Sequence, residues 1–283
     1  MQRAVSIQFF KIYQAVLDSE KVIDIKNDLL IRNALHSVPP QAAVIGDPTV
    51  FSWKKDKIGL IEIPVKFNAG SYDAIFDTRA NISSISQTYA AKLGLKMLNV
   101  AYEEGSGITG IKFKTGLGIA DSLYIGDILF QNVVFQVMPD SILYFAPIDY
   151  SLHIIIGFPV IAALKEVHIY KDGTMLVPSK PSNAPLHNFA LDGLDPVISL
   201  RTPVDTLCFH LDLGATSTDL YYAYFKKYQS EIVKKSAVKT IQIGGAGGIQ
   251  KIDVYVLPQL TLYLGKQESL NSTKSRSTLD LCI

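Results

Sequence analysis

The sequence predicts a mainly β protein with two β segments related by an internal duplication, short helices, and a helical segment at the N-terminus. Three observations lead to this fold class. The spacing of apolar residues is three and four over residues 3–36 and changes to two from Val50 onward. The runs with period two end at Gly, Asn and Asp turns, as strands do. The second half of the chain then repeats landmarks of the first in the same order.

Composition sets the broad class of protein. The chain has 283 residues, 48% of them hydrophobic and 19% charged, which suits one large globular domain or two. The net charge is +1 and the basic residues are scattered, so we expect neither nucleic acid nor an anionic membrane surface as a partner. Cys208 and Cys282 are too few for a disulfide framework or a thiolate zinc site, and they leave the compartment open.

Neither a membrane span nor a clear signal peptide is expected. The longest apolar run, residues 153–164, is well short of the roughly 20 residues that a spanning helix needs. The first 20 residues are interrupted by polar side chains and have no small-residue cleavage site, although a processed N-terminus would look the same. The sequence therefore indicates a soluble protein and leaves its localisation unknown.

The elements follow in a clear order. Residues 1–45 are expected to form two amphipathic helices that end before Pro39 and Pro40. A first β segment covers residues 48–178, a linker 179–189, and a second β segment 190–283. The helices are expected to pack on one of the β segments or to belong to an upstream region; they could instead dimerise or act as an inhibitory segment across a cleft.

The second β segment repeats the first. "IFDTRANISSIS", "QTYAAKLGL", "GSGITG" and "SLYIGDILFQN" return in order as "HLDLGATSTDLY", "YAYFKKYQSEIV", "GGAGG" and "TLYLGKQESLN". Asp77 and Asp212 are 135 residues apart, and Gly126 and Gly265 are 139 apart. Four landmarks that keep their order and spacing indicate a duplication.

Each copy carries an incomplete aspartate motif. The first reads D-T-R-A-N-I-S from Asp77, the second reads D-L-G-A-T-S-T from Asp212, and superposed they give D-[TL]-[RG]-A-x-x-[ST]. This pattern resembles the D-T-G-A-x-x-[ST] signature of aspartic proteases in the retropepsin-like, pepsin-like family, in its bacterial two-lobed form. The resemblance covers roughly residues 48 to 271 and includes "IIIGFP" (154–159), which in that family threads behind the first aspartate.

The resemblance implies two pepsin-like β lobes, a catalytic dyad and supporting residues. Two carboxylates about 3 Å apart cannot both ionise, so they share a proton; one activates a water while the other donates to the substrate carbonyl. The implied catalytic residues are Asp77 and Asp212, and the supporting residues are Thr78, Ala80, Ser83, Gly157, Gly214, Ala215 and Thr218. The structural alternative is that both aspartates are ordinary turn residues after strands. Ser83 and Thr218 are expected to be structural, bonding locally or capping the following helix.

The resemblance implies that the glycine-rich stretch at 105–110 lies where this family carries its flap. A mobile hairpin tip over a cleft fits both glycine-rich stretches, and the alternative is two ordinary turns. "GSGITG" formally matches G-x-G-x-x-G, but a strand pattern follows it instead of the helix that dinucleotide binding requires. The implied flap glycines are Gly105, Gly107, Gly110, Gly244, Gly245, Gly247 and Gly248. Tyr102 is expected to be a half-buried strand tyrosine or a flap aromatic.

Three departures bear on activity. Arg79 replaces a glycine, which predicts backbone strain if the position needs glycine-only angles, and its charge would favour ionised Asp77. Leu213 replaces the second Thr, so half of a hydroxyl lock between the loops is lost. The tail after residue 265 is polar and strand-poor, which predicts that the second lobe lacks its closing strands, exposes core, and needs a partner chain or is truncated.

The remaining signals are weak. The five histidines show no metal-ligand spacing, and His210 would share a strand face with Asp212. The sequence thus predicts an aspartic endopeptidase acting on peptide or protein substrates with no metal or organic cofactor. The first alternative is an inactive protein that binds peptide segments in its cleft. The second is a dimer that pairs two first lobes.

Overall fold

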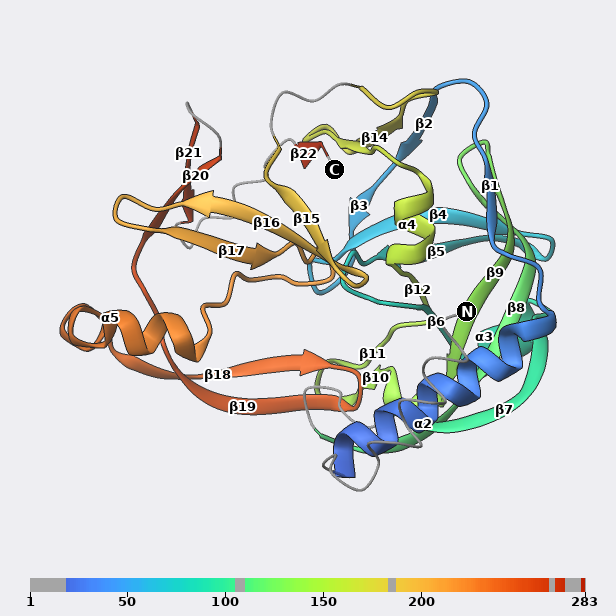
Figure 1. Cartoon of the computed structure of the whole chain (residues 1–283), viewed down its shortest axis with the longest axis horizontal. Coiled ribbons are helices and arrows are strands. Elements are labelled where there is room, and N and C mark those ends of the chain that lie inside the picture. Colours follow the sequence, from blue (N-terminus) through green and yellow to red (C-terminus); the bar gives the residue numbers. More distant parts are fainter. Residues whose placement is uncertain (1–18, 105–109, 183–186, 265–267, 273–280, 283) are drawn as a thin grey trace.

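The fold is mainly β with few helices, as predicted, and the computed structural model describes residues 19–104, 110–182, 187–264, 268–272 and 281–282 (Figure 1). The α-helices within these residues are α2 (Ser19–Ala34), α3 (Gln87–Lys92), α4 (Phe158–Ala163) and α5 (Tyr222–Lys235). Short 3₁₀ turns occur at η1 (Leu35–Ser37), η2 (Asp140–Ile142) and η3 (Ala146–Ile148). None of these described helices is both long and apolar enough to cross a membrane.

The first β segment is built around one large sheet. Its strand order is β1-β9-β6-β12-β5-β4-β8-β7, with β3 beside β4 and a further pairing of β8 with β9. The strands are β1 (Ala42–Val44), β3 (Lys54–Lys55), β4 (Ile61–Phe67), β5 (Gly70–Phe76), β6 (Ser83–Ser86), β7 (Lys96–Glu104), β8 (Phe113–Ile125), β9 (Ile128–Met138) and β12 (Ile154–Ile156).

Period-two alternation places the core of this segment. In β4, Ile63, Val65 and Phe67 are buried while Lys66 between them faces outward, which is the pattern of a strand with one apolar face. The fully buried side chains Phe76, Phe130 and Phe135 belong to the same core. Burying such side chains is the main source of the free energy that stabilises this segment.

A second sheet of the first segment includes a strand from residues 281–282. Its order is β2-β14-β13-β22, with β2 (Thr49–Ser52), β13 (His168–Ile169), β14 (Thr174–Val177) and β22 (Leu281–Cys282). A small pair of strands, β10 (Tyr144–Phe145) and β11 (Tyr150–Ser151), stands apart. The tail after residue 265 thus contains β22 and β21 (Glu268–Ser272), so the prediction of a strand-poor tail is wrong for these residues.

The second β segment is smaller and less buried. Its sheet has the order β15-β16-β20-β21 with β17 beside β16, and the strands are β15 (Phe189–Asp192), β16 (Asp195–Arg201), β17 (Thr206–His210) and β20 (Leu260–Leu264). A separate hairpin joins β18 (Val238–Gly245) to β19 (Gly248–Tyr255). Among the described residues, the buried aliphatic or aromatic side chains of this segment are Leu200, Ile232 and Leu262. The duplication itself stays a prediction.

The described N-terminal helix packs on the first segment, as expected for that part of the chain. Helix α2 lies along β7 in Figure 1, and the Asn27 side-chain amide donates a 2.7 Å hydrogen bond to the carbonyl oxygen of Glu103 on that strand. Residues 3–18, which carry the first of the two predicted helices, lie outside the described residues.

Strand β12 is the element that positions the candidate site. It inserts between β5, to which it is parallel, and β6, to which it is antiparallel. The residue after it, Gly157, donates its N–H to the Ser83 hydroxyl at 3.0 Å, and Phe158 N–H donates to the carbonyl of Ala80 at 2.8 Å. The predicted threading of "IIIGFP" behind the Asp77 loop is therefore confirmed.

Replacing Gly157 by alanine should destabilise the protein by about 2 kcal/mol, because the site cannot take a methyl group. A Cβ at this position would lie 2.5 Å from the carbonyl oxygen of Ala80 and 2.9 Å from that of Ile82. Both obstacles are backbone atoms of the Asp77 loop. The free energy of unfolding in urea measures the effect.

Gly46→Ala is the matched control, because a Cβ there would meet no heavy atom within 4 Å. Equal unfolding free energies for Gly157→Ala and Gly46→Ala would contradict the close packing behind the Asp77 loop.

Candidate active site

Asp77 stands at the end of β5 in a loop fixed by its neighbours. Its backbone N–H donates to the carbonyl oxygen of Ile156 on β12 at 3.0 Å. Its carboxylate oxygen Oδ1 accepts the backbone N–H groups of Arg79 at 2.8 Å and Ala80 at 3.2 Å. The loop therefore holds the carboxylate in one orientation from the backbone alone.

Asp212 follows β17 in the second segment, in the corresponding place after a strand. The residue before it, Leu211, donates its N–H to the carbonyl of Pro196 at 2.8 Å. The carboxylate oxygen Oδ1 of Asp212 is buried and has no hydrogen-bond partner among the described residues. A buried acceptor without a partner is costly unless a proton or a ligand satisfies it.

The hydroxyl of Thr78 joins the two aspartate loops. It donates to the carbonyl oxygen of Leu211 at 2.5 Å and accepts the backbone N–H of Leu213 at 2.9 Å, and the Thr78 side chain is fully buried. These two bonds flank Asp212. This is the half of the hydroxyl lock that the sequence leaves intact, since Leu213 offers no hydroxyl in return.

The Asp77 carboxylate packs directly against Gly214. A Cβ on Gly214 would lie 2.5 Å from Oδ2 and 2.6 Å from Oδ1 of Asp77, closer than real Cβ contacts allow. Gly214 does not have a positive φ, so the position requires glycine for space and not for backbone angle. The two loops thus face each other at close range.

Burial raises the pKa of both carboxyls. Burial raises the pKa of Asp77 to about 6, and the negative charge of Asp212 contributes to this rise, while the N–H groups of Arg79 and Ala80 oppose it. Burial is also the main cause that raises the pKa of Asp212. This rise is opposed by the charge of Arg79, the backbone N–H of Gly214 and the nearby His210. With a pKa of about 6, Asp77 retains its proton at mildly acidic pH.

Arg79 is exposed and unstrained. It is not among the residues with positive φ, so the position does not need glycine-only backbone angles and the strain that such angles would cause is absent. The guanidinium Nη1 donates to the hydroxyl of Tyr221 at 3.3 Å, across 142 residues of sequence. The side chain leaves the loop toward solvent and the second segment.

The other predicted supporting residues divide into two groups. Ser83 is buried and accepts the N–H of Gly157, which is 74 residues further along the chain, whereas Ser86 caps α3. Ala215 and Thr218 are exposed, and α5 begins after Tyr221 without a side-chain cap. Neither Ser83 nor Thr218 caps the helix that follows it, although the buried hydroxyl of Ser83 has a structural role, as expected.

Two hairpins carry the glycines that the sequence assigns to flaps. The β7–β8 hairpin includes Gly110, whose φ is +67°, while Gly105 and Gly107 lie outside the described residues. In the β18–β19 hairpin Gly244 pairs with Ile249 and Gly245 with Gly248, and Gly247 at the tip donates its N–H to the Ile142 carbonyl at 3.0 Å. The flap role of both hairpins stays a prediction.

Tyr102 on β7 is buried, contrary to the expected half-buried position.

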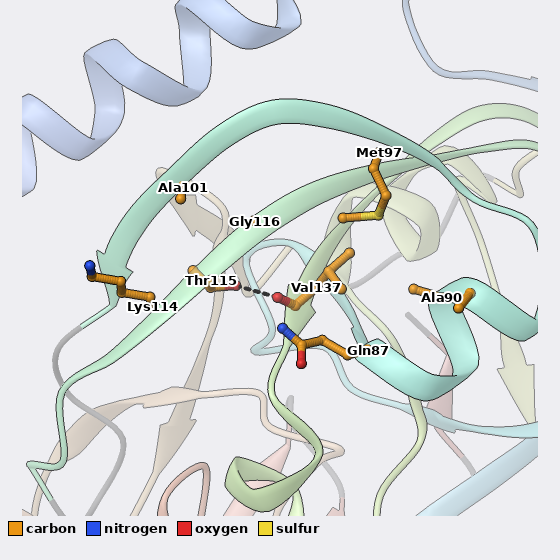
Figure 2. Close-up of a pocket in the computed structure, with 9 residues that line it drawn as sticks. Gln87, Ala90, Met97, Ala101, Lys114, Thr115, Gly116 and Val137 are labelled. Carbon is orange, nitrogen blue, oxygen red and sulfur yellow. Dashed lines mark hydrogen bonds between the residues drawn. The ribbon is translucent and has the colours of Figure 1, made fainter.

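A pocket of about 380 Å³ opens between α3 and the β7–β8 hairpin (Figure 2). A bulge in β7 between Met97 and Ala101 separates the strands at this point. Two of the lining residues bond to each other, since the Thr115 hydroxyl donates to the Val137 carbonyl at 2.9 Å, the dashed line in Figure 2. Its lining residues are Gln87, Ala90, Ala91, Met97, Ala101, Lys114, Thr115, Gly116 and Val137, and neither aspartate is among them.

Comparison with known proteins identifies the class of the first segment. Residues 63–160 match the family described as aspartyl protease, and this range contains Asp77, Gly157 and the whole of the β7–β8 hairpin. The match confirms the resemblance to aspartyl proteases over residues 63–160, while the resemblance of the second segment stays a prediction.

Solved structures were compared as well. A retropepsin-like aspartic protease from Rickettsia conorii matches with 18% sequence identity and a TM-score of 0.31, covering 49% of this chain and 94% of its own. None of the curated proteins matches this chain.

Sequence reasoning missed one residue of the site. Tyr221 contacts Arg79, but no motif includes it and the pair is separated by 142 residues. Its place just before α5, in the tyrosine-rich run "LYYAYFKKY", was the one available signal.

Thr78→Val should lower the free energy of unfolding by about 2 kcal/mol, because valine keeps the shape but leaves the Leu211 carbonyl and the Leu213 N–H without their partner. Thr78→Ser retains the hydroxyl and should recover most of the loss. Unfolding in urea measures both variants. A valine variant as stable as the wild type would mean that the hydroxyl does not join the loops.

Proposed function

We propose that this protein is an aspartic endopeptidase in which Asp77 and Asp212 hydrolyse peptide bonds with a water molecule. The observation that carries the proposal is the Thr78 hydroxyl bonded on both sides of Asp212, which brings the second loop to the first. The substrate would be an extended polypeptide lying between the two hairpins. Membership of residues 63–160 in the aspartyl protease family supports this reaction class.

The chemistry follows from one proton shared by two carboxyls. The ionised carboxylate accepts a proton from water as the water oxygen bonds to the peptide carbonyl carbon, and the protonated carboxyl donates to the carbonyl oxygen. The carbon–nitrogen bond then breaks as the nitrogen takes up a proton, which releases an amine and a carboxylic acid. Because the carboxyls interact, the proton belongs to the pair and not to one residue.

Peptide cleavage should be greatest at acidic to mildly acidic pH and decline as the pH rises through about 6, the pKa of Asp77. Above that pH both carboxyls are ionised and the proton donor is lost. Mass spectrometry of a peptide mixture, incubated from about pH 3 to about pH 7, measures the profile.

Asp212→Asn is the control, and cleavage should vanish in it. Cleavage that persists in this variant would instead favour pairing of two first segments in a dimer. A rate that stays flat into alkaline pH would contradict the shared proton.

A second candidate function is peptide binding without catalysis. The observation that favours it is Arg79, whose positive charge lowers the pKa of both aspartates and so opposes proton sharing. The same cleft would then hold a peptide or protein segment.

Arg79→Gly separates the two candidates. The variant keeps the backbone N–H but removes the charge, so the pKa values of Asp77 and Asp212 rise and the alkaline limb of the cleavage profile moves to higher pH. Cleavage rates across the same pH series measure the change. An inactive wild type whose Arg79→Gly variant is folded and also inactive would favour the binding protein.

A further inference from the structure

The guanidinium of Arg79 stands at the exposed mouth of the candidate site and connects the two segments. Its backbone N–H holds the Asp77 carboxylate, so the residue cannot move away from the aspartates without disturbing them. Its Nη1 donates to the Tyr221 hydroxyl at 3.3 Å, and Tyr221 is 59% exposed. The Tyr221 ring in turn lies 6.4 Å from the ring of His210, two residues before Asp212.

Most of the hydrogen-bonding capacity of this guanidinium is unused. An arginine side chain has five N–H donors in a planar fork that fits a carboxylate with two parallel bonds. One donor reaches Tyr221, and among the described residues the side chain forms no ion pair with an Asp or Glu. A donor set of this kind is ready to receive an anionic group of a ligand.

A ligand carboxylate near the two aspartates would be repelled by them and attracted by Arg79. Asp77 and Asp212 repel a peptide that carries a carboxylate near the cleaved bond. Without a cation, acidic peptides would be poor ligands of this cleft. Arg79 supplies that cation on the solvent side, where an incoming side chain or chain end can reach it.

We propose that Arg79, held in place by Tyr221, is a specificity residue that binds a carboxylate of the peptide next to the cleaved bond. Two sources offer this chemistry: an Asp or Glu side chain, and the free carboxylate at the end of a short peptide. The inference rests on the proposed peptidase function, but recognition of the carboxylate can be measured by binding alone.

The test uses four fluorogenic peptides of one sequence. One pair differs by Glu against Gln beside the cleaved bond, and the other pair differs by a free against an amidated C-terminus two residues after it. The wild type should cleave the carboxylate member of one pair about tenfold faster, the range of a hydrogen-bonded charge pair. Whichever pair shows the preference identifies the source of the carboxylate.

Variants then assign the preference to Arg79. Arg79→Gln should abolish it, Arg79→Lys should retain part of it because the charge remains, and Tyr221→Phe should weaken it. Lys66→Gln on β4 is the matched control, since it removes one exposed positive charge without touching either aspartate loop. Equal rates on both members of both pairs, or a preference that survives in Arg79→Gln, would overturn the inference.

Binding separates this inference from the proposed function. Dissociation constants of the same labelled peptides are measured by fluorescence anisotropy in an Asp77→Asn background, with and without Arg79→Gln. A carboxylate preference in binding without cleavage by the wild type would support Arg79 recognition and contradict the peptidase. Cleavage without any carboxylate preference would support the peptidase and contradict Arg79 recognition.

Discussion

The insertion of β12 between β5 and β6 is the constraint on which the candidate site depends. A strand of three residues fits there because its side chains are apolar and its exit is a glycine. Gly157 passes so close to the carbonyls of Ala80 and Ile82 that the backbone of the Asp77 loop has one available path. The Asp77 N–H and the Ser83 hydroxyl then complete the attachment. The orientation of Asp77 therefore follows from main-chain packing and not from its own side chain.

The loop of Asp212 is supported differently. Within the described residues no strand inserts beside β17 as β12 does beside β5. The bonds that flank Asp212 come from Pro196 and from the Thr78 hydroxyl of the first segment. The second segment also buries few apolar side chains. One aspartate is thus fixed by its own segment, while the other takes much of its position from a contact between segments.

Local patterns in the sequence predicted most of the elements but few of the contacts between them. Alternation located β4 and β5, and the aspartate motif with "IIIGFP" located the Asp77 loop and its threading strand, because these signals lie within a few residues of one another. The contact of Arg79 with Tyr221 and the pairing of β22 with β13 join positions far apart in the chain. No local pattern records such pairs. The absence of a positive φ at Arg79 also could not be predicted, since a residue type does not determine the φ of its position.

The pKa values of the two aspartates depend on how the positive charge of Arg79 compares with the effect of burial. A guanidinium near two carboxyls favours their ionised forms, but Arg79 is exposed, and solvent screens an exposed charge more than a buried one. Burial is the largest influence on the pKa of Asp77, so this pKa still rises to about 6. The charge of Arg79 therefore does not outweigh the effect of burial on the pKa of Asp77. Gly214 is different, because there a side chain would collide with the Asp77 carboxylate itself. The two loops tolerate an arginine on the side that faces solvent and require a glycine on the side where the carboxylate packs.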